Sequence, residues 1–194
     1  MSRISREISI NDHPVVVSTP YRLSPKQKEL LNKEIELLAN DVIEECESPY
    51  AEPVVLVPKP NGTIILCVDY RKVNAVTEPD KFPLPVMDTL LHDARSTAFM
   101  SILDLKTGYH QIEVNPAERD KTGFVCPFGT FRYKRMPFGL RNAPATFQRL
   151  MDRFRNGFPA GNILVYLDDI FVLSETFGQH IQDLKLVSEC LKYV

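Results

Sequence analysis

The chain has 194 residues, of which 44% are hydrophobic and 25% are charged, and its formal net charge is −2. This composition is typical of a globular protein and excludes disordered, collagen-like and low-complexity chains. Because the net charge is slightly acidic, any binding of nucleic acid has to depend on local clusters of positive charge.

Cysteine usage and hydropathy restrict the class of protein further. The four cysteines form no C-x-x-C pair, so the sequence predicts reduced thiols and neither a structural zinc site nor a redox motif. No apolar run is long enough for a signal peptide or a membrane-spanning helix. We therefore expect a cytoplasmic protein with no membrane partner.

The first predicted elements are a leader, a helix and a hairpin. Residues 1–22 predict a leader or an edge strand, and Ser24-Pro25-Lys26-Gln27 is a capping-box start for a helix over 25–41. Two apolar strands, 54–57 and 64–68, flank an Asn61-Gly62 turn and predict a β-hairpin. A proline-rich stretch then leads to a short helix near 86–93.

The second half of the chain mixes strands with two helices. A helix is predicted from Asn142 to Asn156, and an amphipathic helix reaches the C-terminus. Strands are predicted at 97–105, 109–114, 122–126, 131–135, 163–167 and 170–173. The fold class expected from this order is α+β, with helices packed on an antiparallel sheet.

Two adjacent acids, Asp168 and Asp169, interrupt an apolar run that would otherwise predict one buried strand. Two neighbouring carboxylates repel one another, so keeping both ionised requires water or a cation. An exposed strand-turn-strand hairpin is the structural alternative, since Asp is a good turn residue. The pair lacks the glycine that tight hairpins prefer, which slightly favours a functional role.

A third acid, Asp104, ends another apolar strand. Taken alone, an Asp at a strand end is more often a cap or turn former than a catalytic group. If its strand pairs with the strand near Asp168 and Asp169, however, three carboxylates converge at one edge. Hard oxygen ligands of this kind suit two Mg²⁺ or Mn²⁺ ions, which can activate a hydroxyl and stabilise a pyrophosphate leaving group.

Between the two acidic segments, residues 121–149 carry cations and no Asp or Glu. Such cations can follow a phosphate backbone, and we favour contact with a template or primer over the alternative of a solvated face. The interleaved phenylalanines are interpreted as core residues. The cations are Lys121, Arg132, Lys134, Arg135, Arg141 and Arg149.

These segments resemble a known family. Residues 166–169 (Tyr-Leu-Asp-Asp) resemble the Y-x-D-D box of reverse transcriptases, and residues 103–112 (Leu-Asp-Leu-Lys-Thr-Gly-Tyr-His-Gln-Ile) resemble the first catalytic-aspartate motif of gypsy-type LTR retrotransposons. The intervening and fingers motifs are similar at 136–140, 142–148, 48–50, 53–55 and 68–71 with Asn74. The similarity runs from about residue 24 to the end of the chain.

The resemblance implies catalytic roles. Asp104 and Asp168 would hold both metal ions, Asp169 would have a lesser ligand role, and the Leu105 carbonyl would complete a metal shell. Tyr109 would exclude a 2′-hydroxyl from the incoming sugar, Phe138 and Gly139 would border the nucleotide, and Lys59 would meet the triphosphate. The structural alternatives are a strand tyrosine packed in the core for Tyr109 and a solvated loop lysine for Lys59. Nucleic acid would be contacted by Arg71, Arg132, Lys134, Arg135, Arg141, Gln148, Arg149 and Tyr166.

One position departs from the family pattern. The strand before Val68 usually carries an arginine that contacts the triphosphate, and this chain has Ile65 there. Losing a bidentate phosphate donor should weaken nucleotide binding. Ile64-Ile65 is also simply a good strand sequence, which is the structural alternative.

The resemblance also implies an architecture and an activity. The fold would be a right-hand polymerase without its thumb, with fingers at 23–78 and 112–142 and palm at 79–111 and 143–194. The reaction would be RNA-directed DNA polymerisation from dNTPs on a primed RNA or DNA template. Thumb, ribonuclease H and integrase segments of a Pol polyprotein would be partners. A catalytically weak or inactive relic that only binds nucleic acid is the alternative.

Overall fold

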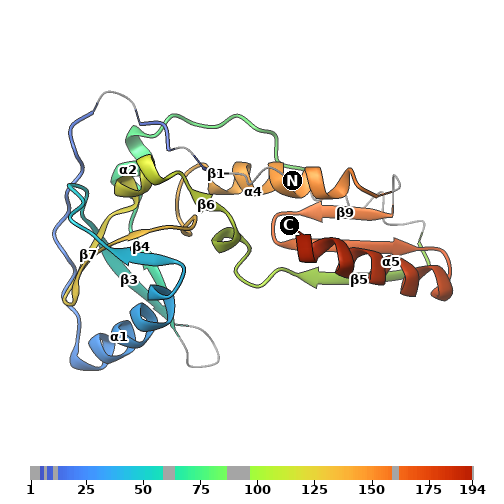
Figure 1. Cartoon of the computed structure of the whole chain (residues 1–194), viewed down its shortest axis with the longest axis horizontal. Helices are drawn as coiled ribbons and strands as arrows, with labels where there is room; N and C mark the ends of the chain where they lie inside the picture. Colours follow the sequence, from blue (N-terminus) through green and yellow to red (C-terminus); the bar gives the residue numbers. More distant parts are fainter. Residues whose placement is uncertain are drawn as a thin grey trace. The chain divides into compact units, whose positions relative to one another are not determined.

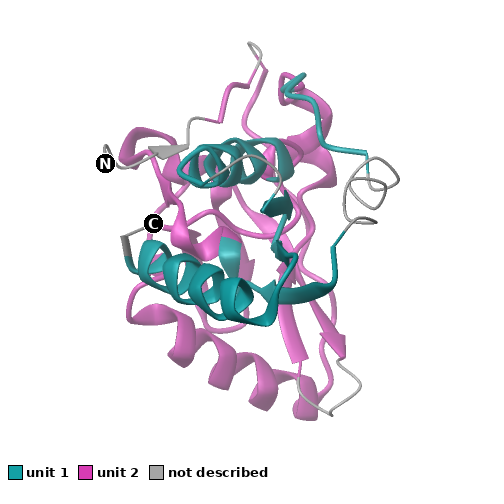
Figure 2. Cartoon of the chain, turned by 90° about the vertical axis from the view of Figure 1, so that its right-hand side faces the viewer, with its two compact units in different colours: residues 1–3, 80–108, 144–194 teal, residues 4–79, 109–143 magenta. Residues whose placement is uncertain are grey.

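The computed structural model describes residues 5–6, 8–10, 13–58, 64–86, 97–158 and 162–193. Lys59, the predicted Asn61-Gly62 turn and most of the predicted helix at 86–93 lie outside these residues. The chain divides into two compact units, which Figure 2 colours separately. Unit 1 comprises residues 1–3, 80–108 and 144–194, and unit 2 comprises residues 4–79 and 109–143.

Unit 2 is built on a five-stranded sheet with the order β2-β8-β7-β3-β4 (Figure 1). Its strands are β2 (Ile43–Glu45), β3 (Glu52–Pro58), β4 (Ile64–Val68), β7 (Phe124–Cys126) and β8 (Gly129–Tyr133). It also contains α1 (Pro25–Ala39), α2 (Arg71–Val76), the 3₁₀ helix η3 (Pro116–Thr122) and a parallel pair of β1 (Ser5–Arg6) with β6 (Glu113–Val114).

The local signals predicted for unit 2 explain several of its elements. The Ser24 hydroxyl accepts a hydrogen bond from the Gln27 backbone, and the Gln27 side chain accepts one from the Ser24 backbone, so the predicted capping box is confirmed. Leu31 and Ile35 bury the apolar face of α1. The predicted hairpin is confirmed as β3 paired antiparallel with β4.

Two of the strand predictions in unit 2 are wrong in part. Residues 109–114 do not form one strand: Gly108–Gln111 is the 3₁₀ helix η2, and only Glu113 and Val114 pair as β6. The predicted strand at 122–126 begins at Phe124, because residues up to Thr122 belong to η3. Asn115 caps η3 by accepting a hydrogen bond from the Ala117 backbone, a local interaction that competes with strand formation.

The carboxylate of Glu52, at the start of β3, is fully buried. One oxygen accepts a hydrogen bond of 2.8 Å from the Ser18 hydroxyl. The other oxygen, Oε1, has no hydrogen-bond partner among the described residues. Burial therefore raises the pKa of Glu52 above its usual value of 4.5.

Replacing Glu52 with glutamine is expected to stabilise the protein at neutral pH. Because the folded pKa is raised, the protonated form favours folding, and that stability is lost as pH rises from the unfolded pKa through the folded pKa. Glu52→Gln should raise the free energy of unfolding at pH 7 by about 1 kcal/mol and flatten its dependence on acidic pH. Urea unfolding at pH 5 and pH 7 measures this, with the exposed Glu47→Gln as control. Loss of stability at pH 7 would contradict it.

Unit 1 contains a three-stranded antiparallel sheet with the order β5-β10-β9 (Figure 1). The strands are β5 (Phe99–Asp104), β9 (Ile163–Tyr166) and β10 (Asp169–Ser174), and the helices are α4 (Ala143–Arg155), α5 (Phe177–Cys190) and the 3₁₀ helix η4 (Leu191–Tyr193). Phe147, Met151 and Phe154 of α4 are buried, as are Ile170 and Val172 of β10.

A series of hydrogen bonds between polar side chains connects α5 to β5 and β10. The buried Ser174 hydroxyl donates to Asp183 at 2.8 Å, so it accepts from Nδ1 of His180 at 3.1 Å. Nε2 of the same imidazole lies 2.8 Å from the Ser101 hydroxyl, so the hydrogen bonds continue to β5. Ser101 therefore faces α5, and its neighbours Met100 and Ile102 lie on the opposite face of β5, where they are exposed.

No helix in the described ranges is both long enough and apolar enough to cross a membrane.

Candidate active site

The pairing of β5 with β10 brings the predicted acids together. Asp104 is the direct partner of Asp169 in the antiparallel register, and Asp169 is also the partner of Tyr166 on β9. Directly opposed residues project from the same face of a sheet with Cβ atoms about 4.5–5.5 Å apart. Asp104, Asp169 and Tyr166 thus share the face of the sheet opposite α5. Tyr166 packs there against a cluster of Leu164, Phe171 and Leu173.

Asp168 occupies the tight turn between β9 and β10. The preceding residue, Leu167, has a φ of 49°, a left-handed conformation that is unusual for a side chain other than Gly or Asn. The backbone N–H of Leu105 donates to the Asp168 carbonyl at 2.9 Å. This bond ties the segment after β5 to the turn and holds the two acidic motifs in register.

The carboxyl group of Asp168 has the properties of an ion ligand. Its Oδ1 atom is buried and has no hydrogen-bond partner among the described residues. Burial raises the pKa of Asp168, and the nearby carboxylates of Asp104 and Asp169 raise it further. A buried carboxylate oxygen next to two like charges is costly unless a proton or a cation compensates it.

The donor set therefore fits a divalent ion, although it is not a closed cage. In the part of the chain that is described, no group of three or more His, Cys, Asp or Glu side chains is gathered as a ready-made metal cluster. Asp104 is exposed, whereas Asp168 and Asp169 are half-buried. Carboxylates at an open edge are the pattern of Mg²⁺ sites, in which the ion keeps several waters and binds only one or two protein carboxylates.

Gly108 has no side chain and therefore leaves room for the carboxyl group of Asp168. A Cβ atom at residue 108 would lie 2.7 Å from Oδ1 of Asp168 and 2.6 Å from Cζ of Phe147. Both distances are shorter than van der Waals contact, so only glycine fits between α4 and the acidic turn. Gly108 lies within the motif at 103–112, but its position four residues after Asp104 does not indicate which side chains pack against it.

Three of the four predicted nucleotide-binding residues lie together in unit 2. The ring centroids of Tyr109 and Phe138 are 5.1 Å apart, and Tyr109 is buried. Gly139 follows Phe138 with a φ of 90°, a conformation that favours glycine. The fourth, Lys59, lies outside the described residues. Ile65 is half-buried on β4 opposite Val57, as its strand-like sequence indicated.

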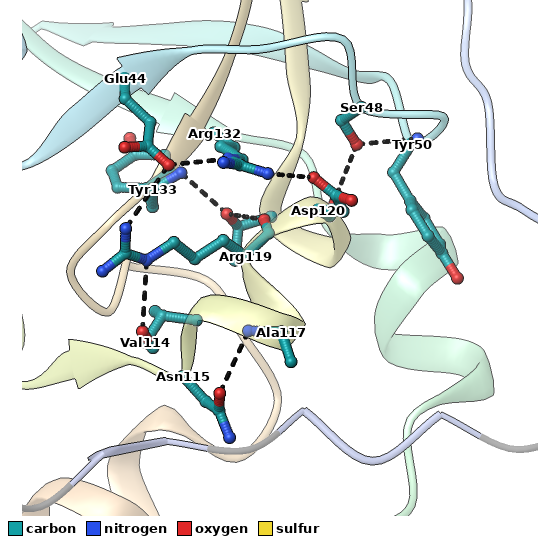
Figure 3. Close-up of polar contacts among 11 residues, drawn as sticks. Glu44, Ser48, Tyr50, Val114, Asn115, Ala117, Arg119, Asp120, Arg132 and Tyr133 are labelled. Carbon is teal, nitrogen blue, oxygen red and sulfur yellow. Dashed lines mark hydrogen bonds and ion pairs between the residues drawn. The ribbon is translucent and has the colours of Figure 1, made fainter.

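Arg132, predicted to contact nucleic acid, is part of an ion-pair network within unit 2 (Figure 3). Its guanidinium donates to Glu44 on β2 at 2.8 Å and to Asp120 on η3 at 2.6 Å. Arg119 reaches the same Glu44 carboxylate at 3.5 Å. Through these contacts the Arg132 side chain connects β8 to β2 and η3. They account for the orientation of the guanidinium without a bound phosphate.

Other predicted cations also bind protein groups. Arg149 makes two hydrogen bonds to Asp80 and lies over the Phe82 ring, with its guanidinium carbon 4.6 Å from the centroid. Arg135 donates to Asp41. Arg141 donates to two backbone carbonyls of unit 2. Lys134 makes no ion pair to any described residue.

Arg71 forms an ion pair within the protein and is still exposed to solvent. It binds both carboxylate oxygens of Asp69, and this pairing holds the pKa of Asp69 well below its usual range. Its side chain nevertheless remains 82% exposed. A guanidinium held in place by a carboxylate but open to solvent can still meet an external phosphate.

The sequence profile of the family described as "Reverse transcriptase (RNA-dependent DNA polymerase)" matches residues 57–194. The chain is a member of the reverse transcriptase family. The resemblance inferred from the motifs is thereby confirmed at the level of the family.

Individual relatives of the chain agree with this family assignment. The chain is 37% identical over 190 residues to the Retrovirus-related Pol polyprotein from transposon 297 of Drosophila melanogaster, covering 95% of this chain and 18% of that protein. It is 35% identical over 173 residues to the Transposon Tf2-3 polyprotein of Schizosaccharomyces pombe, covering 89% of this chain and 13% of that protein. The chain therefore spans less than a fifth of the length of these relatives.

Solved structures show the same fold. The Prototype Foamy Virus protease-reverse transcriptase superposes with a TM-score of 0.88 at 27% identity, over 97% of this chain and 25% of that one. The foamy viral enzyme in complex with an RNA/DNA hybrid gives a TM-score of 0.85 at 25% identity, over 97% of this chain and 26% of that one. The predicted α+β fingers-and-palm fold is confirmed. The sheet of unit 1 is antiparallel as predicted, whereas in the sheet of unit 2 β3 pairs with β7 in parallel.

Proposed function

We propose that this chain carries the polymerising centre of an RNA-directed DNA polymerase, which adds dNTPs to a primer 3′-hydroxyl under the direction of a template. The observation that carries the proposal is the register of β5 and β10. It opposes Asp104 to Asp169 and leaves Asp168 Oδ1 buried and unpartnered beside them. Family membership supplies the reaction class, and the acids supply the charge that it requires.

The acids would hold two Mg²⁺ or Mn²⁺ ions. Asp104 and Asp168 are the main proposed ligands, with Asp169 and the Leu105 carbonyl in lesser roles. Such ions, when bound, activate the attacking hydroxyl and stabilise the charge on the leaving pyrophosphate. The protein itself contributes position and charge: phosphoryl transfer needs little covalent chemistry from side chains.

The nucleotide would be bound by Tyr109, Phe138 and Gly139, with Lys59 at the triphosphate. A buried tyrosine ring fixed by a neighbouring phenylalanine is rigid enough to exclude a 2′-hydroxyl by steric contact. Ile65 supplies no phosphate donor where the family usually has arginine, so we expect weak dNTP binding and a raised KM.

Template and primer would be held first of all by the exposed Arg71 and the half-buried Lys134. Arg132, Arg135, Arg141 and Arg149 already bind protein groups, so we give them a supporting structural role in this proposal. The foamy viral relative has been solved with an RNA/DNA hybrid, which supports a hybrid duplex as the ligand class here. We further propose that the thumb, ribonuclease H and integrase segments of a Pol polyprotein are partners of this chain. The site of action would be the cytoplasm or a retroelement particle.

The test is incorporation of labelled dNTPs on a primed RNA template with Mg²⁺ or Mn²⁺, beside Asp168→Ala. We expect extension that follows the template sequence and vanishes in the variant. Equal signals from both proteins would contradict the polymerase proposal. Turnover without template would indicate a different palm-fold enzyme, such as a nucleotidyl cyclase. Binding of primer-template without extension would support the inactive relic that Ile65 favours.

A further inference from the structure

Gln148 is one of the few completely buried polar side chains in the described residues. It was predicted to contact nucleic acid, but a side chain with no exposed surface offers none to a ligand. Its Oε1 accepts a hydrogen bond from the Leu167 backbone N–H at 2.9 Å, and its Nε2 donates to the Val165 carbonyl at 3.4 Å. The amide therefore binds the backbone on both sides of Tyr166.

This pattern is the one a neighbouring strand would make. Among the described strands β9 is at the edge of its sheet, so the outward N–H and C=O groups of Val165 and Leu167 pair with none of those strands. The Gln148 amide supplies one donor and one acceptor at the spacing of those groups. It thus satisfies the edge of β9 with a side chain of α4 at the point where the strand enters the acidic turn.

The orientation of the amide is also fixed. Nε2 donates to the Asp152 carboxylate, one helical turn further along α4, at 3.1 Å. A carboxylate accepts only, so the nitrogen must face Asp152 and the oxygen must face Leu167. The side chain cannot flip without losing all three hydrogen bonds and placing its oxygen against the acceptor oxygens of Asp152 and Val165.

Leu167 is the residue that most needs this support. Its left-handed backbone is strained, and strained conformations persist only where the surroundings impose them. Leu105 holds the turn from the β5 side through the Asp168 carbonyl, and Gln148 holds it from the α4 side through the Leu167 N–H. Asp168 lies between these two anchors.

We propose that Gln148 is a positioning residue: its amide fixes the backbone of Leu167 and, through it, the direction of the Asp168 carboxylate. The proposal rests on the proposed function in so far as Asp168 acts in polymerisation. The side chain itself touches neither substrate nor ion.

The kinetic test uses Gln148→Met, which keeps the side-chain length and removes both hydrogen-bonding groups. We expect kcat for primer extension to fall about 10- to 100-fold, the size of effect that a misplacement of about 1 Å causes, with little change in the KM for dNTP. Ser174→Ala is the matched control, because it breaks buried hydrogen bonds in the same unit at the far end of β10. It should lower Tm and leave kcat unchanged.

A double variant provides the rescue. Gln148→Glu with Asp152→Asn exchanges the amide and the carboxylate, so residue 148 still accepts from Leu167 and now accepts from residue 152 as well. Net charge is unchanged, and only the longer contact to Val165 is lost. We expect kcat to return to within a few-fold of the wild-type value. Equal kcat losses in the double variant and in Gln148→Met would overturn the proposal.

Backbone amide exchange separates this inference from the polymerase proposal. The Leu167 N–H should exchange at least tenfold faster in Gln148→Met than in the wild type, whereas the Ile170 N–H in β10 should keep its rate. The double variant should restore protection of Leu167. This result is expected even if the wild-type chain does not polymerise. Unchanged Leu167 exchange in Gln148→Met would overturn the positioning role whatever the activity.

Discussion

Replacing Asp104 or Asp168 with asparagine is expected to lower the rate of primer extension by on the order of 1000-fold, which corresponds to about 4 kcal/mol of activation free energy. Asparagine keeps the size of the side chain and removes the charge that would bind divalent ions and offset the charge of the reacting phosphates. Asp169→Asn should cost less, because that residue has the lesser proposed ligand role. Single-turnover extension at saturating dNTP measures the three variants.

Thermal unfolding of the variants is the control, because it separates a loss of activity from a loss of folding. Asp168 has a buried oxygen with no hydrogen-bond partner in the described part of the chain, and its pKa is raised, so its ionised form destabilises the native protein. Asp168→Asn should therefore unfold at the same temperature as the wild type or higher, while activity is lost. A large fall in Tm together with activity would contradict the assignment of Asp168 to chemistry rather than to folding.

Gly108→Ala is expected to have the second largest effect. The new methyl group would lie 2.7 Å from Asp168 Oδ1 and 2.6 Å from the Phe147 ring, so one of them has to move. Overpacking of this kind typically costs about 1–3 kcal/mol of stability. Displacing Asp168 should in addition lower kcat by roughly 100-fold. Thermal unfolding and primer extension well below Tm measure the two effects separately.

Gly178→Ala, also in unit 1, is the matched control. A Cβ atom there meets nothing within 4 Å, and the residue lies in α5. Alanine favours helix over glycine by about 1 kcal/mol, so this variant should be slightly stabilised and fully active. If Gly108→Ala and Gly178→Ala have the same stability and the same rate of primer extension, the close packing at Gly108 does not affect function.

The parts of the fold that sequence predicts well are those set by local chemistry. The capping box at Ser24 and Gln27 needs only residues three apart, and the two apolar runs that flank Asn61-Gly62 in the sequence predict the pairing of β3 with β4. The acids at 104, 168 and 169 were identifiable because charges inside apolar strands are costly, and such sites persist mainly where they are used.

The parts that sequence predicts poorly depend on partners distant in the chain. Residues 109–114 alternate like a strand, yet η2 forms there instead. The cations at 121–149 are arranged in sequence as if to bind a phosphate backbone. In the structure, however, Arg132 pairs with Glu44 and Arg149 pairs with Asp80, and neither acid is close to its partner in sequence. Gln148 belongs to a recognised motif, but only its burial against β9 shows what its amide binds.

The pairing of β5 with β10 has a consequence for biosynthesis. Asp104 and Asp169 are partners although 65 positions separate them along the chain. Closing such a long loop is entropically unfavourable and slows folding, so a nascent chain leaving the ribosome cannot assemble its acidic edge until β10 has been translated. Every residue of unit 2, by contrast, has been synthesised by position 143. A translation product that stops between these points carries the whole of unit 2 but only Asp104 of the three proposed metal-binding acids.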